Sequence, residues 1–294
     1  LGFDFEAIRA RRPDVVYASI SAYGSKGPMS DQPGYDPLMQ AYTGLMSTTG
    51  YAGGPPTRVG GAVVDYGTGM WAAIAVLAAL RRRDATGEGS EVEAALLDTT
   101  LGWVSYHVTG YLATGSIPGP MGSGVPAIAP YQAFATTDGH VMIAAGNDAL
   151  FARLCEALGV TELASDERFL TNPLRSANHA VLIPLVEERT RLHSTAALLD
   201  LTRRHSVPCS AIRNIAEVVA DPQLAAVDLI ADAPDAEIPE YRDVGIPLRM
   251  DGTRPHAEAT PPHAGEHTRE ILSELGYSNA EVDGLIESGV AEAR

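Results

Sequence analysis

The sequence is short of positive charge, and this shortage excludes one group of functions. Against 37 aspartate and glutamate residues, the 294-residue chain has 21 lysine and arginine residues, for a formal net charge of −16. Nucleic acids and anionic membrane surfaces are bound through clustered positive charge. We therefore expect no nucleic acid partner and no electrostatic attraction to membranes, although a small polyanionic ligand would still need a local cationic group.

Cysteines and long apolar runs are also scarce. The two cysteines, Cys155 and Cys209, are far apart and show no Cys-x-x-Cys spacing, so we expect neither a disulfide framework nor a thiolate metal site, and we expect a cytoplasmic protein. The longest apolar run, residues 70–80, is about half of the roughly 20 residues that a membrane-spanning helix needs. It leads into three arginines, and we interpret it as a buried helix.

Helix and strand patterns alternate in the first part of the chain. Residues 3–12 predict an amphipathic helix that ends at Pro13, and residues 15–20 have the branched side chains typical of a buried strand. The glycine- and proline-rich stretch 24–34 follows the carboxyl end of that strand, where open α/β sheets usually bind ligands. These patterns predict an α/β domain with functional residues in this region.

An aspartate is predicted at each of the next two helix starts. Asp36 can cap exposed amides at the start of its own helix, with a proline in the first helical position. Asp65 follows the apolar residues 62–64 and precedes Tyr-Gly-Thr-Gly and a long helix over residues 70–83. Residues 91–101 fit neither the helical nor the strand period and are compatible with both.

The second part of the chain predicts a smaller α+β domain. Residues 115–130 contain repeated glycine and proline and almost no charge, which indicates a linker or a mobile substrate loop. A hairpin is expected around Asp138-Gly139, followed by helices. The predicted organisation is a large α/β domain over 1–114, the linker or loop over 115–130, a small α+β domain over 131–240, and a return segment with carboxyl-terminal helices over 241–294.

Many short motifs in one order resemble those of the family III coenzyme A (CoA) transferases, which include formyl-CoA and carnitine CoA transferases. Single motifs carry little weight, but the series extends over nearly the whole chain. Among them are Pro33-Gly34-Tyr35-Asp36, Gln40-Ala41, Val64-Asp65 followed by Gly67-x-Gly69, Ile128-Ala129-Pro130-Tyr131-Gln132, and Gly265-Glu266-His267-Thr268.

The resemblance implies a Rossmann-like, CoA-binding large domain, a smaller α+β domain and an interlocked homodimer. It also implies a further segment before the position of Leu1, roughly a hundred residues long and thus about the size of a small domain. The large domain is therefore expected to be partial, with that segment absent or supplied by another chain. CoA is expected as a co-substrate within an acyl-CoA, with a carboxylic acid as acceptor, and no permanently bound cofactor is expected.

The resemblance also implies that Asp65 is the catalytic nucleophile. Moving CoA between two carboxylic acids requires an activated carboxylate, and an enzyme carboxylate provides it through a mixed anhydride and then an aspartyl-CoA thioester. Free amides at the helix entrance could stabilise the oxyanion. From the residues alone, the alternative is that Asp65 is an ordinary N-cap, which would stabilise the helix by about 1 kcal/mol.

Further residues are expected to bind the substrate or CoA. A hydroxyl and an amide near the nucleophile could orient an acyl carboxylate, glycines leave room for a thioester, and the end of the first strand could approach the pantetheine arm. Core packing or helix capping would explain several of the same residues. The predicted binding residues are Tyr35, Asp36, Gln40, Gly67, Gly69, Ser21, Tyr23 and Gly24.

Parts of the sequence match three alternative functions. His263, Glu266 and His267 match the H-x-x-E-H spacing of zinc proteases, but the neighbouring prolines and glycine disfavour the required helix, so no metal site is expected. The 2-methylacyl-CoA racemases resemble these transferases but pair the aspartate with a histidine where this chain has Tyr35, and a tyrosine hydroxyl is a poor base near neutral pH. The third alternative is a non-catalytic partial subunit.

Overall fold

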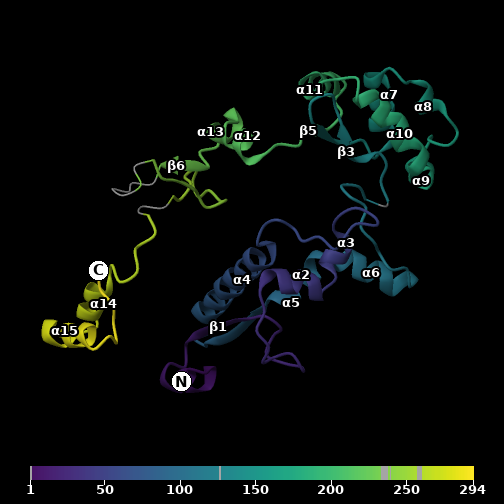
Figure 1. Cartoon of the computed structure of the whole chain (residues 1–294). Coiled ribbons are helices and arrows are strands. Elements are labelled where there is room, and N and C mark those ends of the chain that lie inside the picture. The colour runs from purple at the N-terminus through teal and green to yellow at the C-terminus, as the bar shows by residue number, and fades with distance from the viewer. Residues whose placement is uncertain (1, 126, 233–237, 239, 257–259) are drawn as a thin grey trace. The chain divides into compact units, whose positions relative to one another are not determined.

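The computed structural model describes residues 2–125, 127–232, 238, 240–256 and 260–294 (Figure 1). The chain divides into two compact units, Leu1–Ile212 and Arg213–Arg294. This division does not coincide with the predicted boundaries at 115–130 and 240/241, and the predicted domains stay predictions.

The first part of the larger unit contains a parallel pair of strands connected by helices. Strand β1 pairs with β2, with Val16 opposite Ser90 and Ser21 opposite Ala95. Parallel pairing requires a crossover connection, and the crossover here includes α4, which packs against both strands. The elements are α1 (Phe5–Arg11), β1 (Val16–Ser21), α2 (Asp36–Tyr42), α3 (Leu45–Thr48), α4 (Val63–Thr86), β2 (Ser90–Ala95), α5 (Leu96–Trp103) and α6 (Ser105–Thr114).

Several predicted elements of this part are confirmed, and one ambiguity is resolved. The strand expected over residues 15–20 is β1, and the helix expected over residues 3–12 is α1. The strand was expected to be buried, but none of its residues is buried in the single chain and Ile20 is 59% exposed, so that part of the prediction is wrong. Residues 91–101 matched neither period because they contain both structures, since β2 ends at Ala95 and α5 begins at the next residue.

Helix α4 differs from its prediction in length and in burial. It includes the Tyr-Gly-Thr-Gly stretch that was expected to precede it, and most of the large apolar side chains of residues 70–80 are exposed by half or more, so the expectation of a buried helix is wrong for this chain. Length and hydropathy alone would also allow α4 to span a membrane, but it packs against β1, β2, α2 and α5. The exposed residues are Met70, Trp71, Ile74 and Leu77.

The second part of the larger unit is an antiparallel sheet covered by helices. Its strand order is β3-β4-β5, and the hairpin expected around Asp138-Gly139 is confirmed. Phe134, Ile143 and Phe151 lie in the core between sheet and helices. The elements are β3 (Tyr131–Ala135), β4 (His140–Ala144), α7 (Asp148–Leu158), α8 (Glu162–Ser165), α9 (Asn172–Ala177), α10 (His179–Thr190), α11 (Thr195–Arg204) and β5 (Cys209–Ala211).

The second unit consists of short elements. Capping boxes at Asn214 and Ser278 start two of its helices. Helix α14 begins at Thr268, so His263 and His267 do not lie on one face of a helix as the zinc-protease spacing would require. The elements are α12 (Ile215–Val219), α13 (Pro222–Ala226), β6 (Ile230–Asp232), β7 (Arg242–Val244), α14 (Thr268–Glu274) and α15 (Asn279–Glu287).

The two glycines in the first turns of α4 should differ in their tolerance of a side chain. A Cβ on Gly67 would lie 2.7 Å from Trp103 Cζ2 and 2.9 Å from Thr99 Cγ2, whereas a Cβ on Gly69 would meet nothing within 4 Å. We expect Gly67→Ala to lower the free energy of unfolding by about 1–3 kcal/mol through overpacking. Gly69→Ala should raise it by about 0.5–1 kcal/mol through helix propensity. Urea unfolding of both variants measures the difference, and equal shifts would contradict the packing described for Gly67.

Candidate active site

Asp65 presents an exposed carboxylate on the first turn of α4. It is the third residue of the helix, and the N-cap position belongs to Ala62, so the interpretation of Asp65 as an ordinary N-cap is wrong. Within the described part of the chain, no hydrogen bond or ion pair engages its carboxylate. The side chain borders a shallow hollow lined by Ala62, Asp65, Tyr66, Gly69, Met70 and Ala73.

The start of α4 is held by a buried carboxylate from another helix. Asp36 Oδ2 accepts hydrogen bonds from the backbone N–H groups of Val64, at 2.7 Å, and Asp65, at 3.4 Å. Asp36 is only 3% exposed and is the first residue of α2, whose N-cap position is occupied by Tyr35. The expectation that Asp36 caps its own helix is therefore corrected, because its side chain caps α4. A carboxylate is favourable there, since a helix begins with unpaired N–H groups and a partial positive charge.

Gln40 extends this connection to the loop that precedes α4. Its Nε2 donates to Asp36 Oδ1 at 2.5 Å, and its Oε1 accepts from the Val59 N–H at 2.9 Å. The side chain is fully buried, and both ends of its amide are used. Asp36 and Gln40 thus attach α2 to the loop and to the backbone on which Asp65 lies.

The occupied amides also change the expected chemistry at the helix entrance. Free N–H groups were expected to stabilise an oxyanion, but those of Val64 and Asp65 bind the Asp36 carboxylate. The expectation is therefore wrong for these two groups. Any oxyanion formed at Asp65 has to be stabilised by other donors.

Contacts with α5 hold the other side of α4, and sequence reasoning missed them. The Thr68 hydroxyl donates to Val64 O at 2.8 Å and hydrogen-bonds with the Thr99 hydroxyl at 2.9 Å. Gly67 is buried against Trp103, so its missing side chain is explained by helix packing, whereas exposed Gly69 lines the hollow beside Asp65. Small residues at positions 67 and 68 were the available signal that α4 approaches a neighbour closely.

The other predicted binding residues lie in the turn after β1 and at the start of α2. The Ser21 hydroxyl oxygen accepts from the Gly24 N–H at 3.0 Å, and Gly24 has a φ of 86°, which favours glycine. The Tyr23 ring packs edge-on against Tyr42, with ring centroids 5.3 Å apart. These contacts account for the conformation of the turn. That the turn approaches the pantetheine arm of CoA stays a prediction. The Tyr35 side chain is 73% exposed and available to a ligand.

Neither cysteine is suited to act as a competing nucleophile. Burial raises the pKa of the Cys155 thiol to about 12, and burial also raises the pKa of the Cys209 thiol. Because the thiolate is the reactive form, both side chains are unreactive near neutral pH. The Asp65 carboxylate, by contrast, is exposed.

A comparison with known proteins identifies the family. The model of CoA-transferase family III matches residues 1–268. The chain belongs to CoA-transferase family III. As a family III CoA transferase it is an enzyme, and acyl-CoA is the substrate type that this family uses.

Individual relatives are similar over nearly the whole chain. Succinate–glutarate CoA-transferase of Agrobacterium fabrum is 35% identical, with 93% of this chain and 68% of the relative covered. Human succinyl-CoA:glutarate CoA-transferase is 33% identical, with 99% of this chain and 67% of the human protein covered. The crystal structure of a CAIB/BAIF family protein from Brucella suis matches with a TM-score of 0.79 at 37% identity. The match covers 93% of this chain and 71% of the Brucella suis chain. This likeness confirms the mixed α/β fold.

This family III transferase chain is shorter than its relatives. It spans about two thirds of the length of the curated proteins it matches, with 68% of the Agrobacterium fabrum transferase and 64% of an acyl-CoA transferase from Fusarium pseudograminearum covered.

Asp36→Asn should destabilise the protein and disturb Asp65. An amide in this buried place can accept through one oxygen only, and its own N–H group would face the donor of Gln40 or of Val64. We expect the free energy of unfolding to fall by about 1–3 kcal/mol, the usual cost of unsatisfied buried polar groups, and CoA transfer to slow because the first turn of α4 shifts. Urea unfolding and a transfer assay measure both effects. Asp200→Asn, at an exposed ion pair with Arg203, is the control and should be almost neutral, so similar results for the two variants would contradict the assignment.

Proposed function

We propose that the protein transfers CoA from an acyl-CoA thioester to a carboxylic acid, with Asp65 as the nucleophile. The observation that carries the proposal is an exposed carboxylate with no partner among the described residues, on a helix start held by buried Asp36 and Gln40. A rigid backbone beneath a free carboxylate is what a positioned nucleophile requires.

The proposed reaction passes through an anhydride and a thioester of Asp65. A carboxylate oxygen of Asp65 attacks the thioester carbonyl of the acyl-CoA, and CoA leaves as a thiolate, which produces a mixed anhydride. The thiolate then attacks the aspartyl carbonyl, which releases the first carboxylic acid as a carboxylate and produces the aspartyl-CoA thioester. The acceptor carboxylate repeats both steps in reverse order, and Asp65 is regenerated.

The hollow beside Asp65 supports binding of a thioester. Gly69 lies one helical turn after Asp65 and presents no side chain, while Met70 and Ala73 provide apolar walls. Apolar walls keep water away from the anhydride and the thioester, which water would otherwise hydrolyse.

Relatives suggest the substrates to test first. Their names specify succinyl-CoA with glutarate, succinyl-CoA with mesaconate, and acetyl-CoA with oxalate. We therefore propose succinyl-CoA as donor and a small dicarboxylic acid as acceptor. None of the six residues that line the hollow is cationic, so the second carboxylate of such an acid would be bound by a residue outside this lining.

We also propose that the protein works as a cytoplasmic homodimer. The apolar outer face of α4, defined by Met70, Trp71, Ile74 and Leu77, is exposed in the single chain. Large exposed apolar patches mark sites of protein association. The cytoplasmic assignment is supported by the two free cysteines.

Asp65→Asn should abolish CoA transfer with little effect on stability. An amide cannot form the anhydride, and the substitution at the third helical position removes only the favourable interaction with the helix dipole, worth about 0.3–1 kcal/mol. Transfer is measured with succinyl-CoA and glutarate, and stability by urea unfolding. Asp84→Asn, near the other end of α4 and also exposed, is the matched control and should keep the transfer rate.

Chemical trapping identifies the acylated residue. When the unaltered protein is incubated with acyl-CoA and quenched with hydroxylamine or borohydride, modification should appear on the peptide that contains Asp65. A label on Asp36 or on a cysteine, or an active Asp65→Asn variant, would refute the assignment. Deuterium exchange at the α-position of a 2-methylacyl-CoA without an adduct would instead support the racemase alternative.

Light scattering should show a particle with twice the mass of one chain. Leu77→Glu places a charge on the outer face of α4 and should weaken the dimer at least tenfold, since a buried unpaired charge is costly. Leu192→Glu is the matched control, because both leucines are 67% exposed in the single chain and Leu192 lies outside α4. A monomer at every concentration, or equal effects of both variants, would count against the proposed interface.

A further inference from the structure

The start of α4 carries two carboxylates, and the hollow beside it has no cation in its lining. Asp36 is buried against the first N–H groups of the helix, and Asp65 is exposed on its first turn. None of the six residues that line the hollow is cationic. A dicarboxylic acid whose first carboxylate reacts at Asp65 brings a further negative charge to this place. Because like charges repel, binding of such an acid calls for a cation nearby.

Arg58 is the one basic residue in the sequence around this site. Between Lys26 and Arg81 the chain contains no other lysine or arginine, and it contains no histidine there. Helices α2 and α3 and most of α4 lie within this interval. Arg58 belongs to the loop before α4, four residues ahead of Ala62, which lines the hollow. The positive charge available from this part of the chain is therefore that of Arg58.

The backbone next to Arg58 is fixed by the same two side chains that hold the backbone of Asp65. The Val59 N–H donates to Gln40 Oε1 at 2.9 Å, and Gln40 Nε2 donates to Asp36 Oδ1 at 2.5 Å. The other oxygen of Asp36 accepts from the Asp65 N–H at 3.4 Å. Both side chains are buried. The loop that carries the cation and the turn that carries the nucleophile are thus connected through one hydrogen-bonded network.

The guanidinium of Arg58 has donors available for a ligand. The residue is exposed, and among the described residues its contacts are limited to one long hydrogen bond, from Nη1 to Val59 O at 3.4 Å, without an ion pair. Gly60 and Gly61 follow in the sequence, and a Cβ on Gly60 would meet nothing within 4 Å. Two successive positions between Arg58 and the hollow therefore carry no side chain, and the space around the first of them is open.

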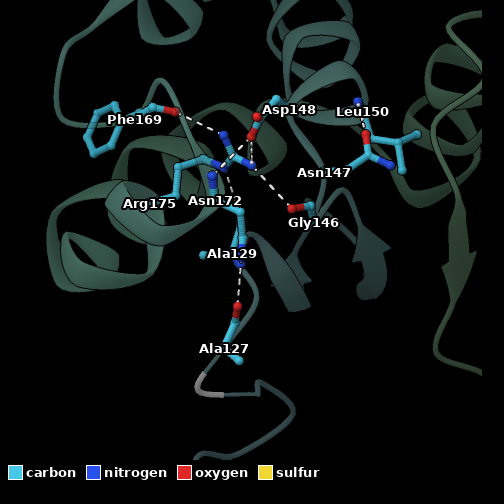
Figure 2. A network of polar contacts seen from close by, with 9 residues as sticks. All are labelled: Ala127, Ala129, Gly146, Asn147, Asp148, Leu150, Phe169, Asn172 and Arg175. Carbon is cyan, nitrogen blue, oxygen red and sulfur yellow. Dashed lines mark hydrogen bonds and ion pairs between the residues drawn. The ribbon is translucent and has the colours of Figure 1, made fainter.

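Arg175 provides the contrast of an arginine whose donors are all used within the protein. Its side chain is fully buried. It donates to Ala129 O at 2.8 Å and to two further carbonyl oxygens, and Asp148 Oδ1 accepts from its Nη2 at 2.8 Å (Figure 2). A buried charge is costly unless it is paired and hydrogen-bonded, and these contacts meet that requirement. Arg175 is a structural residue, whereas Arg58 has no comparable structural role.

We propose that Arg58 determines the specificity for dicarboxylic acids, by binding the distal carboxylate of an acid whose other carboxylate reacts at Asp65. This inference rests on the proposed function. A guanidinium can donate two parallel hydrogen bonds to one carboxylate, and such charge-assisted bonds are roughly twice as strong as neutral ones. A monocarboxylic acid gains nothing from this group. The difference between the two kinds of acid therefore depends on Arg58.

Glutarate and pentanoate provide a matched test, because they have carbon chains of the same length and differ in the second carboxylate. With succinyl-CoA as donor, Arg58→Gln should lower kcat/KM for glutarate about tenfold or more, the loss expected when a hydrogen bond between charged groups is removed. The loss should appear mainly in KM. The inhibition constant of pentanoate against glutarate should not change, and it can be measured whether or not pentanoate accepts CoA. Arg58→Lys keeps the charge without the two parallel bonds, so its kcat/KM for glutarate should be intermediate.

Arg81→Gln is the control for the change in net charge. Arg81 is also an exposed arginine, and it lies about 24 Å from Asp65 along α4, since a helix rises about 1.5 Å per residue. This variant should leave kcat/KM for glutarate unchanged. Urea unfolding should give the same stability for the Arg58 variants as for the unaltered protein, because the Arg58 side chain makes only a long contact with the rest of the described chain.

Several outcomes would overturn the role of Arg58 while CoA transfer stands. These are an unaltered protein that binds pentanoate as well as glutarate, an Arg58→Gln variant that weakens both acids equally, and an Arg81→Gln variant with the same effect as Arg58→Gln. A raised KM for acetyl-CoA with unchanged kcat/KM for glutarate would also overturn it, and would indicate that Arg58 binds the phosphates of CoA. If the unaltered protein transfers no CoA, the proposed function fails and this proposal fails with it.

Discussion

The site depends on one buried contact, between the carboxylate of Asp36 and the first backbone N–H groups of α4. A helix begins with unpaired donors and a partial positive charge, and a buried carboxylate is costly in isolation. When α2 places Asp36 Oδ2 2.7 Å from the Val64 nitrogen, the carboxylate accepts a hydrogen bond from an otherwise unpaired N–H group. Each group thereby offsets the energetic cost of the other. The contact determines where α4 begins and therefore where Asp65 points. Gln40 stabilises the arrangement by binding the second oxygen of the same carboxylate.

This contact also limits the chemistry that the helix start can perform. A pair of N–H groups cannot bind the Asp36 carboxylate and also stabilise a developing oxyanion. Helix starts are common anion-binding sites, but here the anion is part of the protein. We infer that the first turn of α4 serves to hold the Asp65 backbone still, and that stabilisation of the transition state comes from donors other than these two N–H groups.

The parts of the fold that sequence reasoning predicted are those whose signals are local. The hairpin at Asp138-Gly139 and the helices after it were predicted because turn residues, caps and periodicity lie within a few positions of each other. The capping by Asp36 was assigned to the wrong helix because its true partner lies 28 residues later. Gly67 was placed before the helix and predicted to leave room for a thioester, whereas its contact with Trp103 is a tertiary feature. The role of Asp65 came from family resemblance, since its spacing alone also fitted a cap.

The two faces of α4 link the reaction site to assembly. The buried face carries small side chains, such as Thr68 and Ala72, which permit close packing against the sheet and α5, while the outer face carries Met70, Trp71, Ile74 and Leu77. Met70 belongs both to this outer face and to the lining of the hollow beside Asp65. A chain that covers the whole outer face, Met70 included, would therefore also border the hollow. Because anhydride chemistry requires a dry site, the same apolar surface that would hold a partner would complete the wall that the single chain leaves open, and assembly and catalysis would depend on one another.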